Sequence, residues 1–180
     1  MMGAALSAPF VANGHEVRLV GTPLDRDIIA ALKASAPHPK LRAPVAGVTP
    51  YFVEELATAL DGVDAIALGV SSAGVRWAAE ALGAELARAP KPVLMVSKGL
   101  VWQGQRLDVL PDVLQSLLPA AAAARVSPVG VAGPCIAGEL LLGVPTSVVF
   151  TGRSVPACEA WAALARGPFY FVHVEPDVVG

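Results

Sequence analysis

Short apolar runs rich in branched residues alternate along the chain with longer segments in which apolar residues recur every three or four positions. The runs predict buried strands, and the longer segments predict amphipathic helices. The predicted strands span residues 16–20, 45–48, 65–70, 93–96, 125–131, 146–150 and 169–174. The predicted helices span residues 1–12, 25–34, 49–60, 73–87, 110–118, 135–142 and 154–164. This alternation predicts an α/β fold with a doubly wound, mostly parallel sheet.

Two segments are predicted to lie outside these regular elements. Residues 36–40 contain two prolines and are expected to form a loop, and residues 101–106 follow no clear period. No internal repeat and no shift in composition marks a domain boundary. Residues 1–180 are therefore predicted to form one domain.

Three of the predicted strands end in loops of unusual composition. In an open α/β sheet, ligands collect at the carboxyl ends of the parallel strands, which meet at one edge. Lys98 would present an ammonium group to a ligand at that edge, and Gly99 would let the chain turn behind it. The alternative is that Lys98 is simply the first exposed residue after its strand. The three loops are residues 69–72, 97–99 and 133–137.

The composition suits a sheet that helices cover on both faces. Apolar residues make up 54% of the chain and charged residues 16%, which also suits a piece whose surface is covered by another part. The net charge of −2 and the isoelectric point near 5.9 argue against nucleic acid or an anionic membrane as the main partner. A phosphate would therefore be bound by a few local cations and backbone N–H groups.

Cysteine and histidine give no sign of a metal site. Cys135 and Cys158 lie far apart, and neither they nor the three histidines have metal-ligand spacing. We expect free thiols in a reducing cytoplasm. No stretch of about 18 apolar residues is free of charge and proline, so no transmembrane helix is predicted. No basic region precedes the first apolar run, so a secretory signal is not expected.

Residues 1–21 have the pattern of the second half of a dinucleotide-binding βαβ unit. A helix opened by Gly3 is followed by the turn Asn13-Gly14 and by the strand at residues 16–20. The strand that would precede Gly3, and the first two glycines of G-x-G-x-x-G, are not in the chain. An ordinary N-terminal helix is the alternative. The predicted fold class is thus a Rossmann-like sheet lacking its first strand.

Several motifs occur together in an order and spacing that cover nearly the whole chain. They are Met2-Gly3-Ala4-Ala5-Leu6, Asn13-Gly14-His15-Glu16-Val17, Gly69-Val70-Ser71, Ser97-Lys98-Gly99-Leu100, Gly133-Pro134-Cys135-Ile136-Ala137-Gly138-Glu139, Pro145-Thr146-Ser147-Val148-Val149-Phe150, Phe169-Tyr170-Phe171 and Pro176-Asp177-Val178-Val179-Gly180. In this combination the chain resembles the NAD(P)-dependent glycerol-3-phosphate dehydrogenases of the soluble bacterial and archaeal type. The lysine loop and the Gly-Pro-x-x-Ala-x-Glu loop are the most specific of these motifs.

The resemblance implies reversible hydride transfer between a nicotinamide cofactor, NAD or NADP, and the C2 carbon of sn-glycerol 3-phosphate. The product is dihydroxyacetone phosphate, and the reaction feeds glycerophospholipid synthesis. Oxidation of this small phosphorylated three-carbon alcohol needs a base for the hydroxyl proton and a polarising group at the developing carbonyl. By the resemblance, Lys98 is the catalytic residue of this chain and contacts both cofactor and substrate.

The resemblance also implies a set of binding residues. Substrate contacts would come from Lys98, Gly133 and Cys135, and cofactor contacts from Met1, Met2, Gly3, Thr22, Ser71, Lys98, Ala137 and Glu139. Met1 and Met2 would lie in a glycine loop beneath the pyrophosphate, and Gly3 would allow close helix packing. A helix opening after Pro134 would direct backbone donors into the crevice.

Some of these positions have structural alternatives. Ser71 would serve as a helix N-cap, which is compatible with a cofactor contact. Glu139 is nearly as well explained as a glutamate on a helix surface. Cys135 stands where the family has serine or threonine, and it has no base beside it in sequence, so it is not expected to act as a nucleophile.

The choice between NAD and NADP stays open. An acidic residue at the end of the second strand of the βαβ unit would favour the free 2′-hydroxyl of NAD, and Gly21-Thr22 lacks it. Thr22 matches the position beside the adenosine ribose, but neither it nor Asp25 decides the matter. Arg26 would either bind a 2′-phosphate or simply be solvated.

Compared with the family it resembles, the chain is expected to be a piece truncated at both ends. The family's first strand lies at the centre of the sheet, and its loss would expose two edges, which favours aggregation or a homodimer. The family's proton-accepting lysine lies in a helical domain that would follow Gly180, so we expect this chain alone to be inactive. The other interpretations are a Rossmann dehydrogenase of the hydroxyacid or ketopantoate reductase type, and a non-catalytic NAD(P)-binding module.

Overall fold

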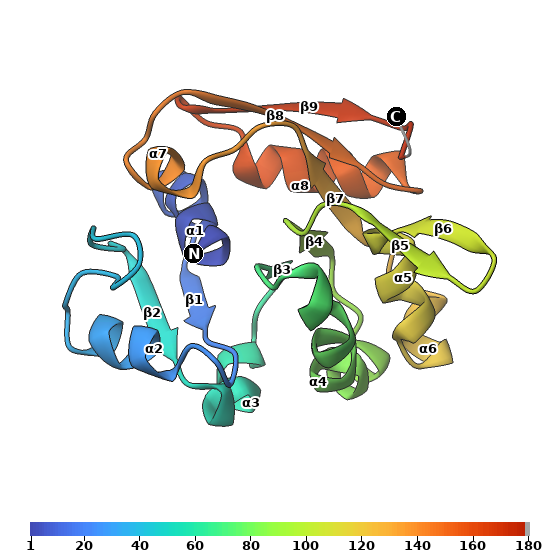
Figure 1. The fold of residues 1–180 in the computed structure, drawn as a ribbon, viewed down its shortest axis with the longest axis horizontal. Helices are drawn as coiled ribbons and strands as arrows, with labels where there is room; N and C mark the ends of the chain where they lie inside the picture. The colour runs from blue at the N-terminus through green and yellow to red at the C-terminus, as the bar shows by residue number, and fades with distance from the viewer. Residues whose placement is uncertain (179–180) are drawn as a thin grey trace. The chain divides into compact units, whose positions relative to one another are not determined.

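The computed structural model describes residues 1–178, and its helices and strands alternate along the chain (Figure 1). Val179 and Gly180, the last residues of the C-terminal motif, lie outside the described residues. The chain forms two compact units. The first contains residues 1–63, 134–147 and 164–171, and the second contains residues 64–133, 148–163 and those from 172 onward. Each unit is therefore assembled from three separate stretches of sequence.

The first unit is built around a parallel pair of strands, β1 and β2. Its elements are α1 (Met2–Ala12), β1 (Val17–Val20), α2 (Arg26–Lys33), β2 (Val48–Tyr51), η1 (Val53–Glu55), α3 (Leu56–Leu60) and α7 (Ala137–Leu141). The two strands form a sheet of their own, with Val17 opposite Val48 and Val20 opposite Tyr51. Because the strands are parallel, their carboxyl ends lie at the same edge.

Apolar side chains at helical spacing form the core of this unit. The core cluster contains Ala4, Ile28, Leu32 and Val45, with Leu19, Leu41, Val48 and Leu141 packed against it. α1 ends at Asn13, whose side-chain amide donates hydrogen bonds to the carbonyl oxygens of Leu164 (2.8 Å) and Arg166 (2.9 Å). The predicted N-terminal helix, its end at Asn13 and the strand that follows it are confirmed.

The second unit contains most of a five-stranded sheet. Its elements are β3 (Ile66–Leu68), η2 (Ser72–Gly74), α4 (Val75–Arg88), β4 (Val93–Met95), β5 (Leu100–Gln103), β6 (Arg106–Val109), α5 (Leu110–Leu117), α6 (Ala120–Ala123) and β7 (Val129–Ala132). The strands β8 (Thr146–Thr151) and β9 (Tyr170–Glu175) and the helix α8 (Val155–Ala165) supply residues to both units. The strand order is β3-β4-β7-β8-β9.

Within this sheet, β3, β4 and β7 are parallel, whereas β8 is antiparallel to β7. All three residues of β4 are 0% exposed, as expected for a parallel strand that is covered on both faces. The predicted α/β fold with a mostly parallel, Rossmann-like sheet is confirmed. The strand predicted at residues 65–70 is shorter and only partly buried. Ala67 is exposed, because β3 lies at the edge of the sheet.

The prediction for residues 45–60 is partly wrong. The strand is β2 at Val48–Tyr51, and the helical segment begins only at Val53. Pro50 was assigned to the helix but lies within β2, opposite Leu19. Among the described residues β2 pairs with β1 alone, and proline is tolerated in such an edge strand because the N–H that it lacks is not needed on the unpaired side.

Residues 101–106 belong to a hairpin, not to an irregular segment. β5 and β6 pair in antiparallel fashion, with Trp102 opposite Leu107, and Gly104 and Gln105 form the turn between them. Gly104 has a φ of +66°, a conformation that two-residue hairpin turns require and that glycine adopts without a steric penalty. The sequence carried this signal as two β-prone runs on either side of a Gly-x pair.

Other boundaries shift by a few residues. β7 begins at Val129, directly after Pro128, and α7 begins at Ala137, because Ile136 keeps an extended backbone (ψ 121°). The 3₁₀ turn η2 precedes α4, and the alanine run at residues 120–123 forms the short helix α6. The predicted helices that correspond to α5 and α8 and the predicted strands that correspond to β8 and β9 are confirmed. Among residues 1–178, no helix combines the length and the apolar character needed to cross a bilayer.

Candidate functional site

The carboxyl ends of β3, β4 and β7 lie along one edge of the five-stranded sheet, because these strands are parallel neighbours (Figure 1). The chain leaves the three strands in loops that begin at residues 69, 96 and 133. The prediction that these turns open on the same edge is confirmed. The backbone of Lys98 therefore lies at the edge where open α/β sheets bind ligands.

Two hydrogen bonds attach the loop after β4 to the end of β3 and to the loop that follows β3. The backbone N–H of Val96 donates to the carbonyl oxygen of Leu68 (3.1 Å), which continues the pairing of the two strands by one residue. The hydroxyl of Ser97 donates to the carbonyl oxygen of Val70. Lys98 comes next and is exposed. Within residues 1–178 its ammonium group forms no ion pair, which leaves the charge available to an anionic ligand.

Ser71 and Gly133 lie in the loops on either side of the Lys98 loop. Ser71 occupies the N-cap position of η2, but its exposed side chain makes no capping hydrogen bond. The Ser71 hydroxyl therefore does not cap the helix in this structure. Gly133 is exposed directly after β7. The structure thus brings Ser71, Lys98 and Gly133 to one sheet edge, where their ligand contacts stay predictions.

Cys135, Ala137 and Glu139 belong to the first unit. Cys135 is half-buried, and it lies close enough to Tyr170 to act on the phenol: burial raises the pKa of Tyr170, and the charge of a Cys135 thiolate would raise it further. Ala137 begins α7, so the helix does not open directly after Pro134. Glu139 is exposed on α7, which agrees with the alternative of a helix-surface glutamate.

Met1, Met2 and Gly3 form the N-terminal end of α1, which packs against α7. Met1 is the N-cap residue, and its carbonyl oxygen accepts a hydrogen bond from the N–H of Ala5 (3.0 Å). Met2 already lies in the helix and not in a loop before it. No acidic side chain occupies the first turn. The free N–H groups of this turn and the positive end of the helix dipole therefore suit a phosphate.

A buried histidine lies in the loop after α2. His38 is 1% exposed, and its Nδ1 accepts hydrogen bonds from the backbone N–H groups of Lys40 and Leu41, each at 3.2 Å. Burial lowers the pKa of His38, and the positive charge of the N-terminal amine of Met1 lowers it further. A ring nitrogen that accepts hydrogen bonds carries no proton, so the geometry and the pKa both indicate a neutral imidazole.

Thr22 and Asp25 close the loop between β1 and α2. The N–H and the hydroxyl of Thr22 both donate to Oδ2 of Asp25, at 3.1 Å and 2.6 Å. Asp25 occupies the N-cap position of α2. Its carboxylate, however, makes no capping hydrogen bond to the helix and bonds back to Thr22 instead. This loop therefore has a defined shape without a ligand.

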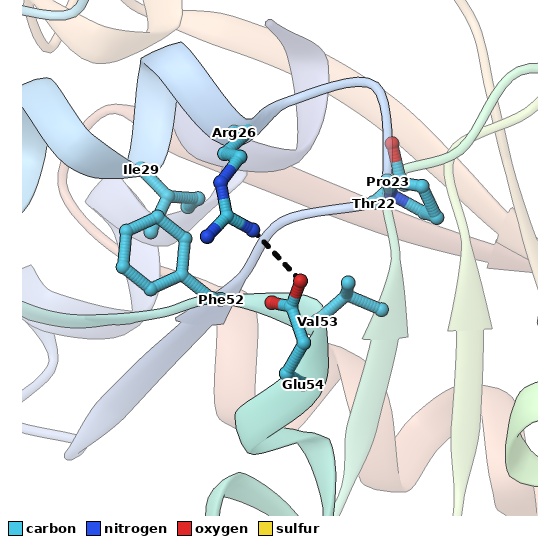
Figure 2. Close-up of a pocket in the computed structure, with 7 residues that line it drawn as sticks. All are labelled: Thr22, Pro23, Arg26, Ile29, Phe52, Val53 and Glu54. Carbon is cyan, nitrogen blue, oxygen red and sulfur yellow. Dashed lines mark hydrogen bonds and ion pairs between the residues drawn. The ribbon is translucent and has the colours of Figure 1, made fainter.

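A small pocket lies at the carboxyl ends of β1 and β2 (Figure 2). It has a volume of about 90 Å³ and is lined by Thr22 and Pro23 after β1, Arg26 and Ile29 of α2, and Phe52, Val53 and Glu54 after β2. The guanidinium carbon of Arg26 lies 5.0 Å from the ring centroid of Phe52, and Nη1 of Arg26 donates to Oε1 of Glu54 at 2.7 Å. Phe52 and Glu54 are not among the predicted site residues, because the sequence pattern predicts a helix over both.

Comparison with known proteins gives a consistent result. The family model described as NAD-dependent glycerol-3-phosphate dehydrogenase N-terminus matches residues 1–157. The NADP(+)-dependent glycerol-3-phosphate dehydrogenase of Archaeoglobus fulgidus is 31% identical over 99% of this chain and 52% of that protein. The NAD(P)+ glycerol-3-phosphate dehydrogenase of Bacillus velezensis is 29% identical over 99% of this chain and 50% of that protein. The chain spans about half the length of the curated relatives it matches.

Solved structures share the fold. The crystal structure of glycerol-3-phosphate dehydrogenase from Coxiella burnetii superposes with a TM-score of 0.74 at 21% sequence identity, over 98% of this chain and 51% of that one. The UDP-glucose dehydrogenase of Pyrobaculum islandicum superposes with a TM-score of 0.65 at 19% identity, over 96% of this chain and 44% of that one. At these identities the similarity is one of fold.

Proposed function

The chain belongs to the NAD-dependent glycerol-3-phosphate dehydrogenase N-terminal family, and we propose that it is the cofactor-binding part of an enzyme that interconverts sn-glycerol 3-phosphate and dihydroxyacetone phosphate. The cofactor in this proposal is NAD or NADP, and the substrate is a small phosphorylated three-carbon alcohol. We further propose that the protein acts in the cytoplasm and that a homodimer is its assembly.

The observation that carries this proposal is the sheet edge at which the loops after β3, β4 and β7 meet. Lys98 brings an exposed ammonium group to that edge. A positive charge there would attract a phosphorylated substrate and would stabilise negative charge on the C2 oxygen as its proton leaves. Ser71 and Gly133, in the flanking loops, are the positions proposed for cofactor and substrate contacts.

The first unit fits the dinucleotide. The phosphates of the dinucleotide would be bound by the backbone N–H groups at the start of α1, at Met1, Met2 and Gly3. No acidic side chain in the first turn of α1 would repel them. The loop at Thr22 would lie beside the adenosine ribose. When bound, the nicotinamide supplies the hydride acceptor, and the residues of this chain bind and orient it.

Binding of reduced dinucleotide to this chain tests the proposal. We expect the fluorescence of NADH, of NADPH or of both to change in a saturable manner, and we expect glycerol 3-phosphate to alter the affinity. Lys98→Met removes the ammonium group, so it should abolish the effect of glycerol 3-phosphate. Circular dichroism would establish that each variant is folded.

Arg125→Met is the matched control for Lys98→Met. Arg125 is also an exposed cation, but it precedes β7 and therefore lies toward the opposite end of that parallel strand. Its loss should leave both the dinucleotide affinity and the effect of glycerol 3-phosphate unchanged. A folded chain that binds neither dinucleotide would contradict the proposed function.

A further inference from the structure

The chain contains a single asparagine, Asn13, which lies at the end of α1 and is followed by Gly14. Its side-chain nitrogen donates hydrogen bonds to two carbonyl oxygens that are distant in sequence, those of Leu164 at 2.8 Å and Arg166 at 2.9 Å. An amide nitrogen has two donors, so this contact uses both. All of these residues belong to the first unit. Asn13 therefore attaches the turn after α1 to the segment at the end of α8.

An asparagine followed by glycine is chemically labile. Asparagine is one of the thermolabile residues, because the backbone nitrogen of the next residue can attack the carbonyl carbon of its side chain. Glycine has no Cβ to hinder that approach. Gly14 has a φ of +83°, and among residues 1–178 no side chain fills the space where its Cβ would lie. The surroundings of Gly14 therefore do not shield its nitrogen from the neighbouring side chain.

Hydrogen bonds in the folded chain hold both reacting groups away from the reaction. The attack requires the N–H of Gly14 to lose its proton and the Asn13 amide to turn toward it. The N–H of Gly14 instead donates to the carbonyl oxygen of Val11 at 2.9 Å. The Asn13 amide is fixed by its two acceptors, and Nε2 of His15 donates to the same Leu164 carbonyl at 3.1 Å. The turn must therefore open locally before the two groups can meet.

We propose that Asn13 is a deamidation site, that the fold protects it until the turn after α1 opens, and that the product cannot restore the lost contact. In the opened turn, the Gly14 nitrogen loses its proton and forms a bond to Cγ of Asn13. The Cγ–Nδ2 bond then breaks, and the nitrogen leaves as ammonia with that proton. Water opens the resulting succinimide ring at one of its two carbonyl carbons, which gives aspartate or isoaspartate. This inference is independent of the proposed function.

The product of deamidation has the wrong hydrogen-bonding groups for this contact. A carboxylate accepts hydrogen bonds and donates none, so it would set an oxygen against the carbonyl oxygens of Leu164 and Arg166. Both carbonyl groups would lose the donor that Asn13 supplies, and a partly buried acceptor without its donor is destabilising. Isoaspartate also lengthens the main chain between α1 and β1 by one carbon. An opened turn that has reacted therefore stays open.

The rate of deamidation in the folded and the unfolded chain tests the protection. One sample is incubated in mildly alkaline buffer and a second in the same buffer with guanidinium chloride, and mass spectrometry follows the peptide that contains Asn13. No other asparagine contributes to the mass change. We expect the folded chain to react roughly tenfold or more slowly, since only its opened fraction reacts. Equal rates would overturn the protection, and an unreactive unfolded chain would overturn the site itself.

Gly167→Ala disturbs the contact without altering the reacting residues. A Cβ at Gly167 would lie 2.9 Å from Oδ1 of Asn13, so it should displace the amide from its acceptors. We expect the folded variant to deamidate several times faster than the unmodified chain. Gly138→Ala is the matched control, because Gly138 lies in the same unit and a Cβ there would meet no described atom within 4 Å. An unchanged rate in folded Gly167→Ala would overturn the role of the two hydrogen bonds.

Asn13→Asp introduces the product carboxylate directly and tests its effect on the fold. The midpoint of denaturation in guanidinium chloride should be lower than that of the unmodified chain, because the two carbonyl groups lose their donor. Gln105→Glu makes the same change from amide to carboxylate at the exposed turn between β5 and β6, and it should leave the midpoint unchanged. An unchanged midpoint in Asn13→Asp would show that the carboxylate is tolerated and would overturn the proposed loss of the contact.

Discussion

The hydroxyl of Ser97 donates a hydrogen bond to the backbone carbonyl oxygen of Val70, and this bond joins the two loops that leave β3 and β4. The residues are 27 positions apart in the sequence. The bond lies one residue before Lys98, beyond the last backbone hydrogen bond between the two strands, which runs from Val96 to Leu68. Ser97 is therefore the final attachment of the chain before the lysine.

Removing the Ser97 hydroxyl should loosen the Lys98 loop. We expect Ser97→Ala to lower the free energy of unfolding by about 1 kcal/mol, because a partly buried hydrogen bond is lost. It should also reduce the effect of glycerol 3-phosphate on dinucleotide affinity. Urea denaturation and fluorescence titration measure the two effects. Ser97→Thr keeps the hydroxyl and should restore both, and an equal loss in Ser97→Thr and Ser97→Ala would exclude the role of the hydrogen bond.

His38 should make stability depend on pH. Burial holds its pKa in the folded chain below the value near 6.5 expected in the unfolded chain. The unfolded chain therefore takes up a proton first as the pH falls. The stability contributed by the neutral ring is complete above pH 6.5 and is lost below it, down to the lowered folded pKa. For this one group, the free energy of unfolding changes by at most about 1.4 kcal/mol per pH unit.

Two histidine variants test this assignment. Asparagine can accept the N–H groups of Lys40 and Leu41 through its side-chain carbonyl, but it does not titrate. His38→Asn should therefore flatten the decline in unfolding free energy between pH 7.5 and pH 5, as measured by denaturation in urea. His173→Asn removes an exposed histidine and should keep the decline of the unmodified chain. A decline that survives in His38→Asn would contradict the prediction.

A side chain at position 47 should destabilise the fold. Gly47 has a φ of +72°, and a Cβ at this position would overlap Cγ1 of Val11 in α1. We expect Gly47→Ala to lower the unfolding free energy by about 2–3 kcal/mol, from backbone strain and overlap together. Gly62 also has a positive φ, +68°, but has open space around it. Gly62→Ala should therefore cost only the backbone part, about 1 kcal/mol.

A double variant separates the two contributions at Gly47. Val11→Ala removes the methyl groups that a new Cβ would meet, so the loss in Gly47→Ala should be smaller in a Val11→Ala background. The difference between the two losses, obtained from a denaturation cycle, is the cost of the overlap. Identical losses in both backgrounds would show that strain at Gly47 acts alone.

The parts of the fold that follow from local pattern could be predicted from the sequence. The apolar run of β4 indicated a strand covered on both faces, and the three loop openings followed from the rule for parallel strands. The segment at residues 45–60 was harder, because Pro50 is compatible with a helix start as well as with an edge strand. Pairing with β1, a contact distant in sequence, decides between them.

The candidate site was predictable to a similar extent. The positions of Lys98 and Gly133 at one edge follow from strand order. The bond from Ser97 to Val70 and the pocket formed by Arg26, Phe52 and Glu54 do not, because each joins side chains from separate elements. A sequence pattern indicates which face of an element is apolar, but it does not indicate which distant carbonyl or ring a polar side chain will meet.

The β5–β6 hairpin gives the Lys98 region its own optical reporter. Trp102 follows the lysine loop and is 65% exposed, whereas Trp161 is 3% exposed and Trp77 is half-buried. A water-soluble quencher such as iodide will therefore quench the fluorescence of Trp102 more strongly than that of the other two tryptophans. Shielding of that emission by an added compound would signal occupancy near the lysine without any label being attached to the chain.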